Sequence, residues 1–313
     1  MSSFRWRHDF IIGSTTLESL AHKHGRSLKE LVTDRPSQDW NCSVPLPAFP
    51  NLQILKFNSM VYDQRSVSKA WIGRAIADNL SSLHRLRLGT ERHTARGYIS
   101  EDNPYAEVDQ KDTFRNVLHG IDKTLANTVN PTIPLSLTSL DLCGLDVRVT
   151  MDEELPRRFK FSHLRTLTLE SCNGSDELLR VLASTSTFTR DTHLTEFNFR
   201  HENPAQHVKT ALELFLSSFT GLRRLSVLLD NVAIMPSLTG VIDKHGKTLQ
   251  TLLWEGKTGF RTEWDVNTSV LLHQDLKGSK DELVQISEGC PSLVELGISL
   301  NWSKHQDVSG HPC

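Results

Sequence analysis

The sequence predicts an α/β solenoid, a curved horseshoe of stacked repeats with a parallel sheet on the concave face and helices on the convex face. Three observations support this prediction. The pattern Leu-x-x-Leu-x-Leu, hereafter the phrase, recurs along a chain that holds 44 leucines among 313 residues. Its copies are regularly spaced, and short helical patterns lie between them. Such internal repeats are typical of solenoid folds.

The copies of the phrase set the repeat length. A weak copy begins at Leu28, and eight fuller copies, some with another large apolar residue in place of a leucine, begin at Leu52, Leu83, Leu137, Leu164, Leu194, Leu222, Leu249 and Leu293. Six of the eight separations lie close to a repeat of roughly 20–29 residues. The 54 residues from Leu83 to Leu137 suggest two periods, one of them degenerate or replaced. The 44 residues from Leu249 to Leu293 suggest one period and an insertion.

The phrase has the alternation of a strand. Side chains of a strand point to alternate faces, so the fourth and sixth residues of the phrase share one face, and the first leucine joins them as the strand begins. Burying one such side chain contributes roughly 1.5–3 kcal/mol. A single repeat cannot bury all three, so neighbouring repeats must stack, with the phrases side by side as parallel strands.

The intervals between phrases predict helices. Apolar residues recur at helical spacing within 175–182, 208–219 and 279–286. We expect Ser175 to cap the first of these helices, and Ser279 with Glu282 forms the pattern of a capping box. Gly25 and Gly246 each follow a cationic turn and precede a phrase, which predicts helix ends closed by a left-handed glycine.

Composition excludes several classes of function. The chain holds 35 Lys and Arg against 37 Asp and Glu, for a net charge of −2, so we expect no nucleic-acid partner. No apolar run approaches the length of a membrane span or a secretory signal, so we expect no membrane association. The five cysteines are widely spaced and form no C-x-x-C pair, which favours reduced thiols in a cytoplasmic or nuclear protein.

No motif in the chain predicts catalysis, a cofactor or a metal site. Gly-rich nucleotide loops, nucleophile elbows and H-E-x-x-H are absent from the sequence. His245-Gly-Lys-Thr248 lacks the upstream glycine spacing of a phosphate loop, and we interpret it as a helix end. His305, His311 and Cys313 lie in the tail without a fourth ligand. The sequence therefore predicts a protein that is not an enzyme.

The phrases resemble those of leucine-rich-repeat proteins. Cys172 and Asn301, each three residues after the phrase's last apolar residue, stand where such repeats place an Asn or Cys that bonds the turn backbone. Irregular copies, long interruptions and the openings Phe161-Ser-His-Leu164 and Phe219-Thr-Gly-Leu222 are similar to the repeat region of fungal F-box proteins. The resemblance covers roughly residues 14–301. The F-box itself is not found, since neither Leu46-Pro47 nor Leu155-Pro156 opens a helix of that kind.

The predicted domain organisation is simple. Residues 1–301 form a single solenoid of about nine to ten irregular repeats, with insertions near 89–136 and 256–278, and residues 302–313 form a flexible tail. Residues at the third, fifth and seventh positions of each phrase face outward from the concave sheet. Ten of these are the candidate partner-binding residues: Arg85, Arg87, Asp141, Thr168, Glu170, Glu196, Asn198, Arg200, Arg224 and Ser226.

The mixed charges of this face favour a protein partner, so the predicted function is a non-enzymatic interaction scaffold. The resemblance implies the substrate-recognition region of an F-box ubiquitin-ligase adaptor, with the Skp adaptor as a partner if an F-box exists outside this chain. Two alternatives stay open. One is a repeat-built regulator of a small GTPase, and the other is a gene-model fragment that lacks its F-box.

Overall fold

A computed structural model provides the structure of the chain. It describes residues 1–6, 13–33, 49–60, 67–90, 117–118, 121, 135–148, 159–185, 192–202, 204–232, 235–257 and 280–298.

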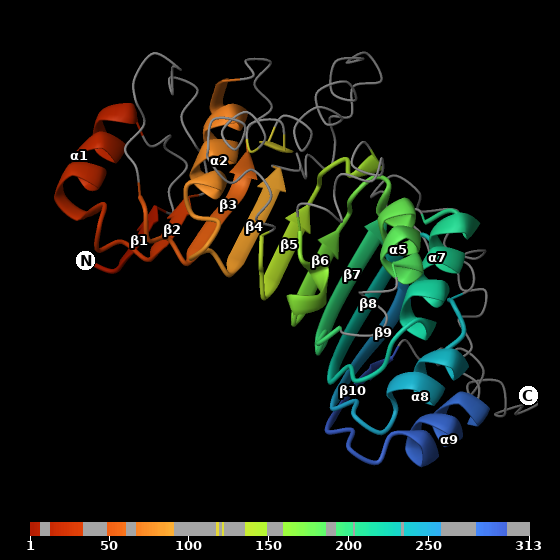
Figure 1. Cartoon of the computed structure of the whole chain (residues 1–313). Coiled ribbons are helices and arrows are strands. Elements are labelled where there is room, and N and C mark those ends of the chain that lie inside the picture. Colours follow the sequence, from red (N-terminus) through yellow and green to blue (C-terminus); the bar gives the residue numbers. More distant parts are fainter. Residues whose placement is uncertain are drawn as a thin grey trace, which may run out of the picture. The chain divides into compact units, whose positions relative to one another are not determined.

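The fold is α/β, with one all-parallel sheet whose ten strands follow one another in sequence order (Figure 1). The strands are β1 Ser3–Trp6, β2 Glu30–Thr33, β3 Ile54–Met60, β4 Arg85–Thr90, β5 Ser139–Cys143, β6 Thr166–Glu170, β7 Glu196–Glu202, β8 Arg224–Asp230, β9 Thr251–Lys257 and β10 Glu295–Ile298. Each copy of the phrase thus forms one strand, beginning at its third residue, as predicted. Strand β1 was not predicted, because it has alternating aromatic residues, Phe4 and Trp6, but lacks the Leu-x-x that opens each phrase.

Helices occupy the intervals between strands. They are α1 Ser14–His24, α2 Val67–Ala77, α5 Ser175–Ser184, α7 Gln206–Ser217, α8 Thr239–His245 and α9 Lys280–Gly289, with a short 3₁₀ turn, η2, at Phe161–His163. The chain divides into two compact units. Unit 1 comprises Met1–Leu178 and Asp191–His193, and unit 2 comprises Leu179–Arg190 and Leu194–Cys313. In unit 2, α7, α8 and α9 cover one side of the strands (Figure 1).

The repeats stack in strict register. Leu86 of β4 pairs with Leu140 of β5, which pairs with Leu167 of β6. All three side chains are at most 2% exposed. The backbone repeats this register where each strand begins: the carbonyl of Gln53 accepts hydrogen bonds from the N–H groups of both His84 and Arg85, at 3.0 and 3.1 Å. Seven further carbonyls at the corresponding positions accept the same two bonds, namely those of Ser2, Lys29, His84, Thr138, Thr195, Arg223 and Gln250.

The long interval between Leu83 and Leu137 is one repeat with an insertion. Strand β4 pairs directly with β5, so no strand from this interval lies between them. Our interpretation as two periods was therefore wrong. The separation of 54 residues equals two repeats of 27 only by coincidence, because a loop at the edge of the sheet can lengthen without disturbing the pairing of the strands. Within this interval, Val117, Leu118 and Ile121 are helical and buried. Most of the two predicted insertions lies outside the described residues.

Helix ends differ from the prediction. Gly25 and Gly246 have right-handed backbones, with φ of −51° and −50°, so neither is a left-handed cap. Gly246 is needed for space, because a Cβ there would lie 2.3 Å from the carbonyl oxygen of Gly289. Ser175 is the first residue of α5, and its buried hydroxyl has no hydrogen-bond partner among the described residues, so the predicted cap is also wrong. Ser279 lies outside the described residues.

Two buried polar side chains tie the helix ends to the preceding strand. Each stands four residues before the first leucine of a phrase. In unit 1, Asn79 accepts a hydrogen bond from the Leu52 N–H at 2.7 Å. In unit 2, His245 is fully buried and accepts a bond from the Leu222 N–H at Nδ1, at 3.4 Å, while Nε2 lies 2.8 Å from the Leu216 carbonyl oxygen. His245 must be neutral to accept at Nδ1 and donate from Nε2.

Burial lowers the pKa of His245 from 6.5. The hydrogen bond to Leu216 raises this pKa and the charge of Lys244 lowers it, and burial is the largest effect. Because the unfolded chain then takes up the proton first, the free energy of unfolding should fall as the pH drops below about 6.5, by at most about 1.4 kcal/mol per pH unit. His245→Asn supplies the acceptor that Asn79 provides in unit 1 and does not titrate. Urea unfolding across this pH range should show a shallower pH dependence for the variant. Equal slopes would contradict this role of His245.

Candidate protein-interaction surface

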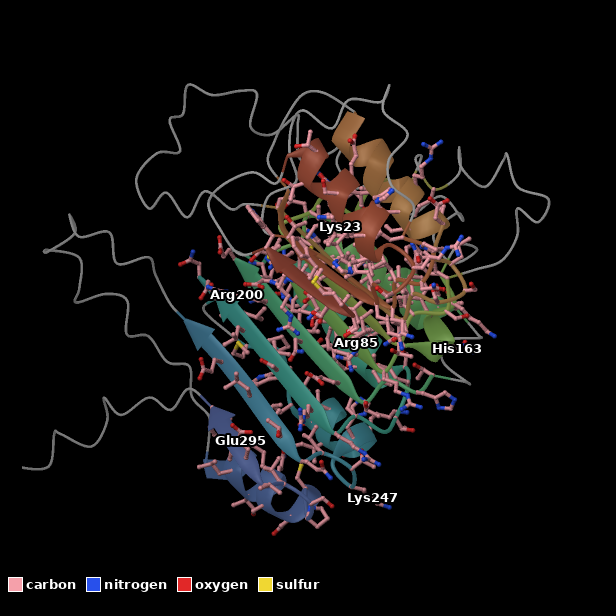
Figure 2. The ribbon with its side chains drawn as sticks, turned by 90° about the vertical axis from the view of Figure 1, so that its left-hand side faces the viewer. Lys23, Arg85, His163, Arg200, Lys247 and Glu295 are labelled. Carbon is pink, nitrogen blue, oxygen red and sulfur yellow. The ribbon has the colours of Figure 1, made fainter. Side chains whose placement is uncertain are left out.

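The candidate site is one face of the sheet, hereafter the open face. It is formed by the third, fifth, seventh and ninth residues counted from the first leucine of each phrase, hereafter the odd positions. Along β5, β6 and β8, buried side chains alternate with half-exposed or exposed ones, and the latter form this face. Figure 2 labels Arg85 of unit 1 and Arg200 and Glu295 of unit 2, which stand on it. The alternation arises because the even positions are taken by the core.

In unit 1, a polar row crosses the sheet. The register places Lys56 of β3 beside Arg87 of β4, and Arg87 beside Asp141 of β5. Thr168 of β6 follows Asp141 in the same row. Arg87 and Asp141 form an ion pair in which Nη1 donates to Oδ2 at 2.6 Å. Their side chains are 33% and 20% exposed, so the pair is half-buried and less screened by solvent than a surface pair.

The ion pair leaves two polar atoms unsatisfied. Asp141 Oδ1 and Arg87 Nε are buried and have no hydrogen-bond partner among the described residues. Burial raises the pKa of Asp141 from 3.8, and Glu170 raises it further, whereas Arg87 and Lys56 lower it. Desolvation is the largest of these effects. Arg87 therefore provides most of the stabilisation of the charged form of Asp141, and Lys56 adds a smaller part.

In unit 2, the open face carries the other candidates. Asn198 donates to Glu196 along β7 at 3.2 Å. Arg200 lies 3.4 Å from Asp230 of β8, and these side chains are 43% and 20% exposed. Arg224 is exposed and Ser226 is half-buried on the same strand.

Of the ten predicted residues, the structure therefore pairs Arg87 with Asp141 and Glu196 with Asn198. Arg200 pairs with a residue that we did not select, and Arg85 is exposed beside Arg87 on β4. The prediction also passed over Leu228 and Leu253, two half-buried apolar residues on the open face of unit 2. Their signal was visible in the sequence, since a leucine at an odd position of the phrase cannot be required by the core.

Side chains that could bind a metal are dispersed in the part of the chain that the structure describes. Those residues include no group of three or more His, Cys, Asp or Glu that could hold a metal ion. The predicted tail, with His305, His311 and Cys313, lies outside them. Among the cysteines, Cys143 is half-buried, and Cys172 and Cys290 are buried. As predicted, the Cys172 thiol contacts the turn backbone, 3.4 Å from the carbonyl oxygen of Leu142. None of the described helices is long and apolar enough to span a membrane.

Comparisons with known proteins identify no family. No protein-family model, no curated protein and no solved structure matches the chain.

The Arg87–Asp141 pair can be tested with a neighbouring control. Arg87→Met keeps much of the apolar stem and leaves the Asp141 carboxylate half-buried and unpaired, so we expect a loss of about 1–3 kcal/mol in the free energy of unfolding near neutral pH. Adding Asp141→Asn should recover part of that loss. Arg85→Met, on the same strand but exposed, should change the free energy by less than about 0.5 kcal/mol. Equal losses for the two arginine variants in urea unfolding would contradict the pairing.

Proposed function

We propose that the chain is a non-enzymatic scaffold that binds a protein partner through the open face of its sheet. The observation that carries the proposal is the set of charged and polar side chains along that face, some fixed by partners on the same or a neighbouring strand. Arg87 with Asp141, Asn198 with Glu196 and Arg200 with Asp230 are such pairs.

A sheet face of this kind suits recognition for an energetic reason. Association costs about 0.5–1.5 kcal/mol for each flexible side chain that must be ordered at the interface. Side chains on adjacent strands that are partly buried against one another have already lost part of their conformational freedom before binding, so ordering them costs less. Patterned charges then decide which partner docks and in which register.

The finer form of the proposal follows the resemblance to fungal F-box proteins. In that form the chain is the substrate-recognition part of a ubiquitin-ligase adaptor in the cytoplasm or nucleus, and its partner is a protein that is marked for ubiquitination. The support is the Leu-x-x-Leu-x-Leu phrases with their Phe-x-x-Leu openings, together with a parallel sheet in sequence order.

A photo-crosslinking amino acid placed on the open face tests both forms. We expect incorporation at Ser139 or Ser226 to trap a distinct protein from cell extract, whereas incorporation at Lys244, exposed on α8, should not trap it. Mass spectrometry would identify the trapped protein. Equal trapping at all three positions would contradict the role of the open face. Trapping without any ubiquitin-pathway component, including the Skp adaptor, would remove the ligase form only.

A further inference from the structure

The open face of unit 2 has an apolar centre. Leu253 of β9 pairs in register with Ser226 of β8, and Leu228 lies two residues further along β8, so the two leucines are diagonal neighbours. Both are half-buried, although nothing in the core requires a leucine at these positions. Leu253 leans over β10, because a Cβ on Gly297 would lie 2.4 Å from Leu253 Cδ1. The glycine thus leaves space for the leucine side chain.

Charged residues flank this centre, because Arg200 of β7 and Glu255 of β9 both pair in register with Leu228, one on each side. The odd positions of β7 to β10 carry seven charged residues whose side chains the structure describes, which are Glu196, Arg200, Glu202, Arg224, Asp230, Glu255 and Glu295. These five carboxylates and two guanidinium groups have a formal net charge of −3, and Lys257 at the end of β9 reduces the excess to −2. Glu255 pairs in register with Leu228, and its carboxylate makes no hydrogen bond or ion pair within the described residues. Glu295 pairs with Thr251 at the start of β9, and its side chain is only loosely held by the Thr251 hydroxyl at 3.4 Å.

The open face of unit 1 has a different balance of charge. The odd positions of β2 to β6 carry three cations and three carboxylates, which are Lys56, Arg85, Arg87, Glu30, Asp141 and Glu170, so their formal charges cancel. The two open faces therefore differ in formal net charge. Of the two, only that of unit 2 combines an excess of carboxylates with the leucine pair.

From these features we propose that the open face of unit 2 docks an extended basic segment of a protein partner, in which lysines or arginines flank one large apolar side chain. This inference rests on the proposed function, since it names the kind of partner that the scaffold binds. The apolar side chain covers Leu228 and Leu253, as the central anchor of an interface does. The flanking cations reach Glu255 and Glu295 at the rim, where charge complementarity sets specificity and the rate of association.

The proposal can be tested by measuring the affinity of fluorescent peptides for the whole chain. The probe is Gly-Ser-Lys-Arg-Phe-Lys-Arg-Gly-Ser, with one control that replaces Phe by Ser and another that replaces each Lys and Arg by Glu. We expect the probe to bind at least about tenfold more tightly than either control by anisotropy. Its affinity should fall as salt is added, because exposed charges are screened. Equal binding of the acidic control, or an affinity that salt does not change, would overturn the proposal.

Matched variants locate the site. Glu255→Lys with Glu295→Lys should weaken probe binding at least about tenfold, and Leu253→Ser should weaken it about tenfold. Asp243→Lys makes the same charge change as one of the two glutamate substitutions, on exposed α8 away from the open face, and should leave binding unchanged. Circular dichroism would verify that each variant is folded. If Asp243→Lys weakens binding as much as the Glu255 and Glu295 pair, the site is not where we place it.

The outcomes also separate this inference from the proposed function. If the Ser226 crosslink traps a partner but the basic probe does not bind, the scaffold stands and its preference for basic segments is wrong. If the probe binds as expected and its addition prevents the Ser226 crosslink, both are supported. If the probe binds but no open-face position traps a protein, the surface recognises basic segments and the proposed scaffold function fails.

Discussion

The fold depends on one constraint: the apolar side chains of each phrase can be buried only by the same positions of the next phrase. Leu225 of β8 and Leu252 of β9 are paired in register, and both are completely buried. Each such leucine contributes roughly 1.5–3 kcal/mol, but only when its neighbours are in place. At β10, where the described sheet ends, the corresponding Leu296 is 42% exposed. The core is therefore a property of the stack, and the contribution of a phrase falls where a neighbour is missing.

This constraint gives the residues of each strand different structural roles according to their position. The even positions form the core, whereas the odd positions form the open face, where the proposed interaction surface lies. The strand beginnings are a third zone, where backbone carbonyls accept paired bonds and where Asn79 and His245 close the helix ends. Stability thus depends on the core and the strand beginnings, and at the open face it depends on the Arg87–Asp141 pair.

The sequence predicted the strands because their signal repeats, whereas it missed what occurs once. The pattern Leu-x-x-Leu-x-Leu located nine of the ten strands, but β1 lacks this pattern and has only the alternating Phe4 and Trp6 as a sequence signal. The role of Gly246 depends on a contact with Gly289, which no local pattern encodes. The ion pair of Arg87 with Asp141 joins residues 54 positions apart, and the long insertion hid that their strands are neighbours. Leu228 and Leu253 were visible at odd positions, but their meaning required knowing the surrounding charges.

Hydrogen exchange on a core variant tests the mutual burial of phrases most directly. Leu225→Ala removes one fully buried side chain from β8, at a cost of about 2–5 kcal/mol. If each phrase buries its neighbours, the amides of β7 and β9 should lose protection nearly as much as those of β8. If exchange quickens in β8 alone, the strands are stable independently of one another, and the account of a shared core is wrong.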